Sequence, residues 1–444
     1  MDLNVLTAIS PIDGRYREKV HELDMYFSEF ALIRYRFLIE AEYFIALVEK
    51  LPQIKHLKEN QLILDLRKRI EEFDLSDAES VKKIEGKINH DVKSVENFMR
   101  ELLHEYPKER EFVHFALTSF DTDGMARPLM LKDAHHHVMM APLRNVVNHL
   151  MKLSESWGNI PFLARTHGQP ASPTKLGKEM FVFVDRLNVQ MKYLNDVLHT
   201  AKLGGATGNF NAHYVAYPGI RWDHFADEFV EKLCLYRSQV TTQIEPYDNV
   251  AAYCHAWMRI NTILIDLCRD MWGYIMLEQI KQKPKDGEVG SSTMPHKINP
   301  IDFENAEGNF GMANALFAHF ADKLPISRLQ RDLSDSTVIR NMGVPLAHTL
   351  IALKAIMKAF GKVAPNIEKI NADLDNNWAV ISEAIQTILR REGYLSSYDV
   401  LKELTRTGEK ITKEALHVFI DLLKVDDSIK DELKAITPWN YTGI

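Results

Sequence analysis

One stretch determines the fold class: residues 247–283, which read YDNVAAYCHAWMRINTILIDLCRDMWGYIMLEQIKQK. It lies between Pro246 and Pro284, and Gly273 is the only helix breaker among its 37 residues. A continuous helix of this length would span about 55 Å, which is longer than an average globular helix. Its apolar side chains fall on more than one face, so the helix must be surrounded by others, from its own chain or a partner.

Two further stretches carry apolar residues at steps of three and four, the spacing of a single stripe along a helix. They cover residues 180–198 and 346–360. Only residues 240–244 show the alternation that is typical of a strand. The sequence therefore predicts an all-α fold with a long central helical bundle. Helix length predicts three helical domains, at residues 1–114, 115–362 (the long helices) and 363–444.

Composition excludes several classes of protein. Of the 444 residues, 46% are hydrophobic and 26% are charged, which is the balance of an ordinary globular protein. The net charge of −7 argues against a general nucleic-acid binder. The three cysteines form no C-x-x-C pair, which indicates a reduced, intracellular protein. No apolar signal core opens the chain, and no run of about 18 mainly apolar residues would span a bilayer. We therefore expect a cytoplasmic protein with no membrane partner.

Five polar segments differ in composition from the bundle helices. The first, residues 89–93, reads NHDVK, and Asn89 is expected to cap the helix that follows. Free N–H groups at that helix start, beside His90 and Lys93, would form an anion site. The alternative is a capped helix with a solvated polar face.

The second and third segments offer hydroxyls and a histidine. Residues 115–121 read FALTSFD, in which Thr118 and Ser119 either donate to a substrate carboxylate or cap a helix. Residues 165–171 read RTHGQPA, which places His167 in a rigid turn between Thr and Gly. A histidine in this setting is either structural or an acid–base catalyst.

The fourth and fifth segments combine glycine, hydroxyls and cations. Residues 287–300 read GEVGSSTMPHKINP, which predicts a mobile loop over a site. Lys297 and Asn299, at the end of this loop, are expected to bind an anion and a carbonyl group. Residues 328–340 read RLQRDLSDSTVIR, and guanidinium groups in such a segment match phosphate oxygens. The alternatives are a flexible linker and a charged helix surface.

No sequence pattern indicates a metal or a cofactor. His135, His136 and His137 look like a metal tract, but consecutive helix residues point about 100° apart and cannot converge on one ion. The glycine run at residues 204–208 has the wrong spacing for a dinucleotide site and follows a helix. We therefore predict chemistry without metal or cofactor.

The motifs together resemble the aspartase/fumarase superfamily. Residues 290–300, GSSTMPHKINP, look like its signature loop, and residues 118–119 and 205–209 resemble its other two conserved regions in the correct order. Within the superfamily, residues 10–16 and 165–171 resemble the adenylosuccinate lyase family, as does the run QRD at 330–332. The resemblance implies the superfamily's three-domain helical fold. It also implies elimination of fumarate from adenylosuccinate and from SAICAR, without a cofactor.

The resemblance also assigns roles to residues. His167 would be the general acid and the signature-loop serine the base, placed at Ser291 with Ser292 as the alternative, whereas residue chemistry alone nominates His167 or His296 as the base. Substrate contacts are expected at Arg15, Tyr16, Asn89, His90, Asp91, Thr118, Ser119, Gln243, Lys297, Asn299, Asn305, Arg331, Ser336 and Arg340.

Assembly and two alternative functions complete the prediction. The apolar faces of the long helices favour a symmetric oligomer, and the resemblance implies a homotetramer with shared active sites. One alternative is a sister lyase acting on argininosuccinate or fumarate, although the arginine-rich segments favour a phosphorylated substrate. The other is a structural protein that kept the bundle and lost catalysis.

Overall fold

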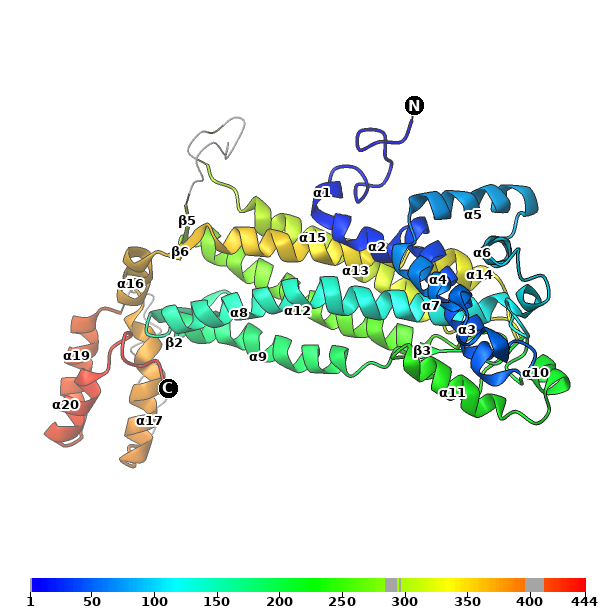
Figure 1. Ribbon diagram of the computed structural model, residues 1–444. Coiled ribbons are helices and arrows are strands. Elements are labelled where there is room, and N and C mark those ends of the chain that lie inside the picture. Colours follow the sequence, from blue (N-terminus) through cyan, green and yellow to red (C-terminus); the bar gives the residue numbers. More distant parts are fainter. Residues whose placement is uncertain (1, 284–293, 295–296, 396–410) are drawn as a thin grey trace. The chain divides into compact units, whose positions relative to one another are not determined.

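The computed structural model describes residues 2–283, 294, 297–395 and 411–444. Helices make up 65% of it, which confirms the predicted all-α class (Figure 1). The α-helices are α1 (Arg17–Val20), α2 (Asp24–Phe27), α3 (Glu29–Lys50), α4 (Gln61–Glu72), α5 (Leu75–Ile88), α6 (Asp91–Leu102), α7 (Ser119–Ala134), α8 (Met140–Ser156), α9 (Leu176–Asn195), α10 (Asn211–Ala216), α11 (Trp222–Lys232), α12 (Asp248–Met276), α13 (Ile301–Lys323), α14 (Ser334–Ile339), α15 (Gly343–Phe360), α16 (Ile367–Asp375), α17 (Ser382–Arg391), α19 (Lys413–Leu422) and α20 (Asp427–Ala435).

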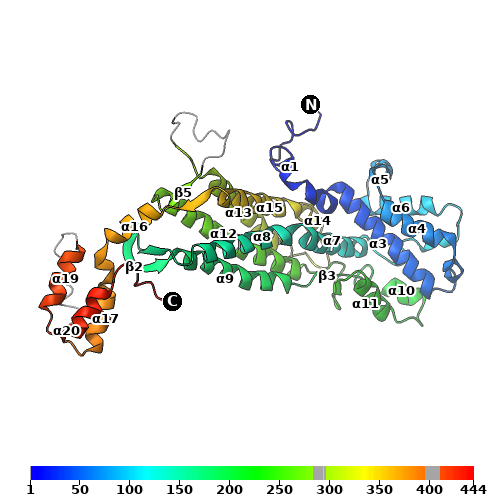
Figure 2. The same cartoon turned by 60° about the vertical axis from the view of Figure 1, so that its left-hand side comes forward.

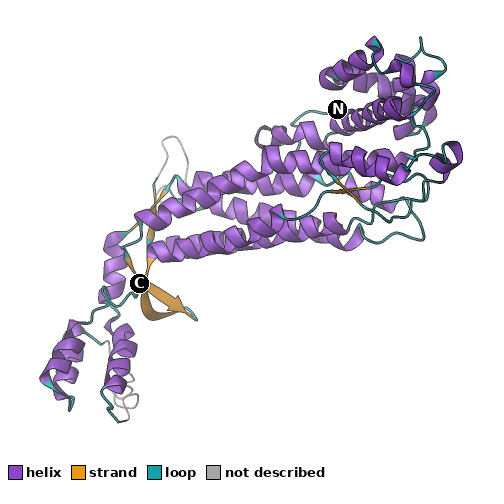
Figure 3. Cartoon of the chain, turned by 60° about the horizontal axis from the view of Figure 1, so that its bottom comes forward, coloured by secondary structure: helices purple, strands orange, loops and turns teal. Residues whose placement is uncertain are grey.

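Short strands, short helical turns of other types and loops make up the rest of the described chain, and Figure 3 shows the strands in orange among the helices. Three two-stranded sheets occur in the described residues, pairing β1 with β2, β3 with β4 and β5 with β6. Their bounds are β1 (Pro161–Thr166), β2 (Gln169–Lys175), β3 (Thr200–Ala201), β4 (Tyr236–Arg237), β5 (Ile280–Gln282) and β6 (Val363–Pro365).

The chain divides into two compact units. The boundaries fall inside α8, α9, α12, α13 and α15, so each of these helices contributes residues to both units. The predicted three-domain division, with limits after residues 114 and 362, stays a prediction. The first unit comprises Met1–Leu143, Gln190–Thr262 and Gly308–Lys354, and the second comprises Arg144–Val189, Ile263–Glu307 and Ala355–Ile444.

Long helices lie side by side to form the bundle, as Figure 1 and Figure 2 show. In the first unit, the buried Asn261 amide of α12 donates to Thr349 of α15 over 3.2 Å. In the second unit, Arg186 of α9 pairs with Asp266 of α12 at 2.6 Å. Trp257 of α12 is fully buried. The long apolar helix expected from residues 247–283 therefore packs against α15 in the first unit and contacts α9 in the second.

Helix α12 is shorter than the sequence predicts. Its regular turns end at Met276, although the N–H of Leu277 still donates to the Gly273 carbonyl over 2.9 Å. Glu278 then takes a φ of 60°, and a left-handed residue cannot continue a right-handed helix. The chain turns at this point into β5, which pairs with β6.

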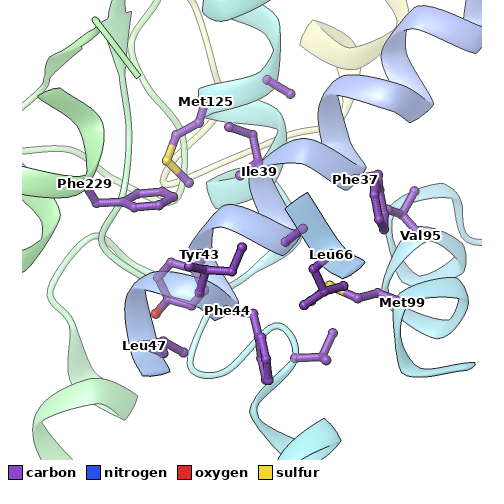
Figure 4. Packing of buried hydrophobic residues seen from close by; sticks show 14 of the residues in the cluster. Phe37, Ile39, Tyr43, Phe44, Leu47, Leu66, Val95, Met99, Met125 and Phe229 are labelled. Atoms are coloured by element: carbon purple, nitrogen blue, oxygen red, sulfur yellow. The ribbon is translucent and has the colours of Figure 1, made fainter. Parts of the chain in front are cut away.

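Helix α3 runs through the apolar core of the first unit (Figure 4). The Ser28 hydroxyl caps its start by accepting the N–H of Ala31 over 3.1 Å, and no glycine or proline interrupts the helix. Phe37 and Phe44 are fully buried, and burial of such a side chain contributes about 1.5–3 kcal/mol to stability. The Tyr43 hydroxyl donates to the Phe115 carbonyl over 3.0 Å, which ties α3 to the segment preceding α7.

Two sequence predictions are wrong: the strand at residues 240–244, and the absence of any run apolar enough to span a bilayer. Residues 240–244 form no strand; the Gln243 amide instead donates to the Ala206 carbonyl over 3.1 Å, so this side chain joins the segment to a neighbouring loop. One stretch, Ser334–Phe360, is long and apolar enough to cross a membrane by composition alone. Because 72% of its most apolar window is buried, we assign it to the core of the bundle.

Candidate active site

A polar pocket of about 690 Å³ lies within the first unit. Five separate parts of the chain line it, namely the start of α6, the start of α7, the loop at residues 206–207, Gln243 and the segment at the start of α14. Seven of the residues predicted to contact substrate line this pocket, namely His90, Asp91, Thr118, Ser119, Gln243, Arg331 and Ser336.

The start of α6 forms one wall, and its cap differs from the prediction. His90 is the N-cap, and its Nδ1 accepts the N–H of Lys93 over 3.2 Å. Asn89 instead ends α5 with a φ of 52°, and its N–H donates to the Glu85 carbonyl over 2.8 Å. Asparagine tolerates left-handed backbone better than most residues, which explains why it ends one helix rather than starting the next.

Thr118 and Ser119 stand where α7 begins, as predicted. Thr118 is the N-cap residue, Ser119 is the first helical residue, and both are half-buried. The N–H of Thr118 donates to Asp121 Oδ2 over 2.8 Å, which fixes the first turn of the helix. Both hydroxyls thus belong to a helix start that lines the pocket.

A buried arginine connects two carboxylates of the pocket. Arg36 donates to Asp123 Oδ1 over 2.6 Å and to Asp91 Oδ2 over 2.8 Å. Arg340 donates to the same Asp91 oxygen over 2.7 Å and to Glu29 over 3.3 Å. Burial alone would raise the pKa of Asp91 and of Asp123, but the charge of Arg36 and the hydrogen bonds that each carboxylate accepts together outweigh it and hold each pKa below its ordinary value. Both carboxylates are therefore ionised at neutral pH.

Arg36→Met is expected to lower the free energy of unfolding by about 1.5–3 kcal/mol, because buried Asp123 loses its closest cation and keeps only Arg127, at 3.3 Å. This loss of stability should be full above a pH of about 4, the ordinary pKa of an aspartate in the unfolded chain, and should shrink in more acidic solution. The reason is that Asp123 has a lower pKa in the folded protein than in the unfolded chain. Its contribution to stability is therefore present above the unfolded pKa and is lost as the pH falls through the folded pKa. Urea-unfolding midpoints at matched protein concentration measure it.

The control is Arg67→Met, which removes a pair with Glu42 from a half-exposed side chain. Such a surface pair is worth no more than about 1 kcal/mol. Equal losses in the two variants would contradict a special role for Arg36.

Gln243 joins the glycine loop to the arginine-rich segment. Its amide donates to the Ala206 carbonyl over 3.1 Å, and its Oε1 accepts from Arg331 over 3.3 Å. The Arg331 guanidinium also lies 5.2 Å from the centre of the Phe120 ring. This wall therefore presents a cation whose position is fixed by an amide and a ring, beside the Ser336 hydroxyl.

His167 lies in the second unit, at the turn of the β1–β2 hairpin. His167 and Gly168 have φ values of 53° and 74°, and positive φ at both central residues is what a tight two-residue hairpin turn requires. The rigid turn predicted from the sequence is confirmed, and the imidazole is exposed at its tip.

The second unit also holds three of the predicted substrate contacts. Lys297 and Asn299 precede α13, and Asn305 lies in its first turns. Lys297 is exposed, and its N–H donates to the Met294 carbonyl over 3.0 Å. Ser291, Ser292 and His296 lie outside the described residues.

The remaining predicted contacts lie in the first unit but do not line its pocket. Arg15 is exposed and Tyr16 is the N-cap residue of the short helix α1, with Lys19 Nζ 5.6 Å from its ring centre. Arg340 reaches the pocket through Asp91, as described above. In the described residues, no group of three or more histidines, cysteines and carboxylates could hold a metal ion.

Comparison with known proteins identifies the family. A family model described as "Lyase" matches residues 14–314, and one described as "Adenylosuccinate lyase C-terminal" matches residues 327–442. An adenylosuccinate lyase of Dictyostelium discoideum is 53% identical over 457 residues, covering 100% of this chain and 98% of that protein. The chain belongs to the adenylosuccinate lyase family. Family members from Vibrio cholerae and Escherichia coli are 46% and 45% identical, with the same coverage.

Solved structures of low identity share the fold of this adenylosuccinate lyase family member. A β-carboxy-cis,cis-muconate cycloisomerase of Acinetobacter calcoaceticus matches with a TM-score of 0.71 at 16% identity, over 95% of both chains. A 3-carboxy-cis,cis-muconate lactonizing enzyme of Pseudomonas putida gives 0.73 at 17%, over 95% of this chain and 94% of that one. At this identity the likeness concerns the helical architecture alone.

Sequence reasoning missed several residues that shape the pocket. Asp121 could have been found, because a carboxylate three residues after Thr118 is the pattern of a capping box. Arg36 and Lys202 gave no such signal. Arg36 lies within an apolar helix, 55 and 87 residues from its carboxylate partners, and nothing local indicates that its charge is buried and paired.

Proposed function

We propose that this chain eliminates fumarate from adenylosuccinate to give AMP, and from SAICAR to give AICAR, in purine nucleotide biosynthesis. The full-length identity of 53% to an adenylosuccinate lyase carries the proposal. The pocket of the first unit supports it, because it combines a guanidinium, hydroxyls and a helix N-terminus, which are groups that bind phosphate and carboxylate. The mechanism assigns no step to a metal or a cofactor.

The acid and the base act on two neighbouring atoms of the substrate. Ser291, acting as its alkoxide, takes a proton from the carbon beside a carboxylate and becomes a hydroxyl. The electrons of the broken C–H bond first spread into that carboxylate. They then form the C=C bond of fumarate as the C–N bond breaks. His167 gives a proton to the departing nitrogen, which keeps the electron pair of the C–N bond. Histidine suits this step because its ordinary pKa lies near neutrality.

Charge stabilisation is the harder part of the reaction. A proton beside a carboxylate is very weakly acidic, so the carbanion must be stabilised by cations and hydrogen-bond donors fixed around that carboxylate. We assign this role to Lys297 and Asn299, together with the hydroxyls of Thr118 and Ser119. The two hydroxyls already line a pocket, and the helix start beneath them holds their positions.

The nucleotide would bind in the pocket of the first unit. Arg331, Ser336 and Arg340 suit the phosphate, because guanidinium forks and a hydroxyl match its oxygens. Arg340 would exchange its pairing with Asp91 and Glu29 for the phosphate. The other proposed contacts are Arg15, Tyr16, Asn89, His90, Asp91, Gln243 and Asn305.

We further propose a cytoplasmic homotetramer whose active sites are shared between subunits. Large apolar side chains that stay exposed on long helices support a partner, because such surface costs free energy in water. The described cysteines are all free thiols, which suits a reducing compartment. The exposed apolar residues on α9, α12 and α13 are Phe181, Val182, Val189, Tyr193, Trp272, Met276, Ile301 and Met312.

Absorbance measured while the purified protein meets adenylosuccinate tests the function. We expect conversion to AMP and fumarate, at a rate that an excess of EDTA leaves unchanged. Argininosuccinate and malate, the substrates of sister lyases, serve as parallel arms and should give no product. Turnover of either without adenylosuccinate turnover would replace the proposal by a sister activity, and inactivity on all three would favour the structural-protein alternative.

Arg331→Met is expected to raise KM for adenylosuccinate by about 10- to 100-fold, because a hydrogen bond to a charged group is worth about 1.5–3 kcal/mol. Its matched control is Arg328→Met, three residues away. The Arg328 side chain is 82% exposed and bonded to Asp332, so its loss should leave KM nearly unchanged. Steady-state kinetics decide between them, and an equal change in both variants would contradict the phosphate role of Arg331.

A further inference from the structure

One buried carboxylate bonds to two separate segments that approach the pocket. Asp121 is completely buried in the first turn of α7. Its Oδ2 accepts the N–H of Thr118 over 2.8 Å. Its Oδ1 accepts the N–H groups of Gly204 and Gly205, over 2.9 and 3.2 Å, from a loop 83 residues further along the chain.

Lys202 completes the arrangement. Its side chain is 1% exposed, and its Nζ lies 2.8 Å from Asp121 Oδ1 while it also donates to the Gly205 carbonyl. Burial lowers the pKa of Lys202, and the charge of Asp121 opposes that change. Each of these two buried charges is therefore compensated by the other.

The backbone of the loop at residues 204–208 allows neighbouring segments to come close to it. Gly205 and Gly208 have a φ of 78°, where other residues are strained. A Cβ on Gly208 would clash with the Thr241 carbonyl, so the loop also packs tightly against the segment that carries Gln243. Between the two glycines, Ala206 and Thr207 line the pocket.

We infer that Asp121 and Lys202 act as a positioning pair, which fixes the Thr118–Ser119 hydroxyls relative to the 204–208 loop so that both meet the substrate together. The inference rests on the proposed function of these hydroxyls. Neither member of the pair lines the pocket, so neither touches the substrate. Asp121 is suited to this because a carboxylate has two acceptor oxygens, one for each segment.

A stability cycle separates positioning from mere support of the fold. Asp121→Asn and Lys202→Met each leave one buried charge without its partner, and each should lower the melting temperature. The double variant removes both charges and should recover most of that loss. Its asparagine offers a single acceptor oxygen, so it cannot accept the N–H of Thr118 and those of Gly204 and Gly205 at separate oxygens, as Asp121 does.

We expect the double variant to keep kcat/KM for adenylosuccinate about 10- to 100-fold below wild type although its melting temperature recovers, since small misplacements of binding groups have effects of this size. Hydrogen exchange at the Thr118, Gly204 and Gly205 amides should be slow in the wild type and faster in the double variant. Lys369→Met with Asp373→Asn is the control, because this pair lies in α16 and contributes nothing to the pocket.

Three outcomes would overturn the inference. One is recovery of kcat/KM together with the melting temperature, which would make the pair purely structural. Another is unchanged slow exchange at the three amides in the double variant. The third is failure of the double variant to fold, since neutral side chains of similar volume should be tolerated there. An inactive wild type would refute the proposed function instead, and the exchange measurement would still test the coupling.

Discussion

His167→Asn is expected to lower kcat by about 1000-fold, within the range that removal of a general acid produces, while the fold stays intact. The imidazole is exposed at a hairpin tip, so no packing is lost with it. Asparagine is also among the residues that best tolerate the φ of 53° at this position. Steady-state kinetics, circular dichroism and the melting temperature together measure the effect.

The matched control for this variant is Lys175→Gln, in β2 of the same hairpin. It removes a cationic side chain that has no proposed role, and kcat should stay near wild type. A large fall in helical content or melting temperature for His167→Asn would show that the residue supports the fold. Retained turnover would move the acid role to another group.

Mixing two inactive variants is expected to restore activity. If His167 and Ser291 reach each site from different subunits, random assembly of equal amounts of His167→Asn and Ser291→Ala chains rebuilds about one site in four with both groups intact. The mixture should therefore show about a quarter of wild-type activity after joint unfolding and reassembly. Each variant reassembled alone should stay inactive.

A second mixture gives an independent count of the same sites. Wild-type chains reassembled with equal amounts of the His167→Asn/Ser291→Ala double variant should keep about one intact site in four if the residues come from different chains, and about one in two if they come from the same chain. Native mass spectrometry confirms that the oligomers are mixed. No recovery in the first mixture and half activity in the second would refute the shared site.

Much of the helical architecture could be read from local patterns. The run of 37 residues around Trp257 predicts a buried helix because apolar periodicity and the absence of breakers act along neighbouring residues. The same holds for the tight turn at His167, where glycine follows directly. Two local features could not be predicted in this way: the left-handed Glu278 that shortens α12, and the shift of the α6 cap from Asn89 to His90. Several residue types can adopt these backbone conformations, so residue type alone does not identify the position.

The sequence by itself determined the helical class and, through its motifs, the family and the candidate catalytic groups. Only the tertiary structure decided which distant segments share one pocket, and which charges are buried. Asp121 and Lys202 are 81 positions apart, as Arg36 and Asp123 are 87 apart, and each is an ordinary charged residue in its own segment. A charge can leave water only when its partner is already in place, and that condition is set by the packing of the whole unit rather than by neighbours in the chain.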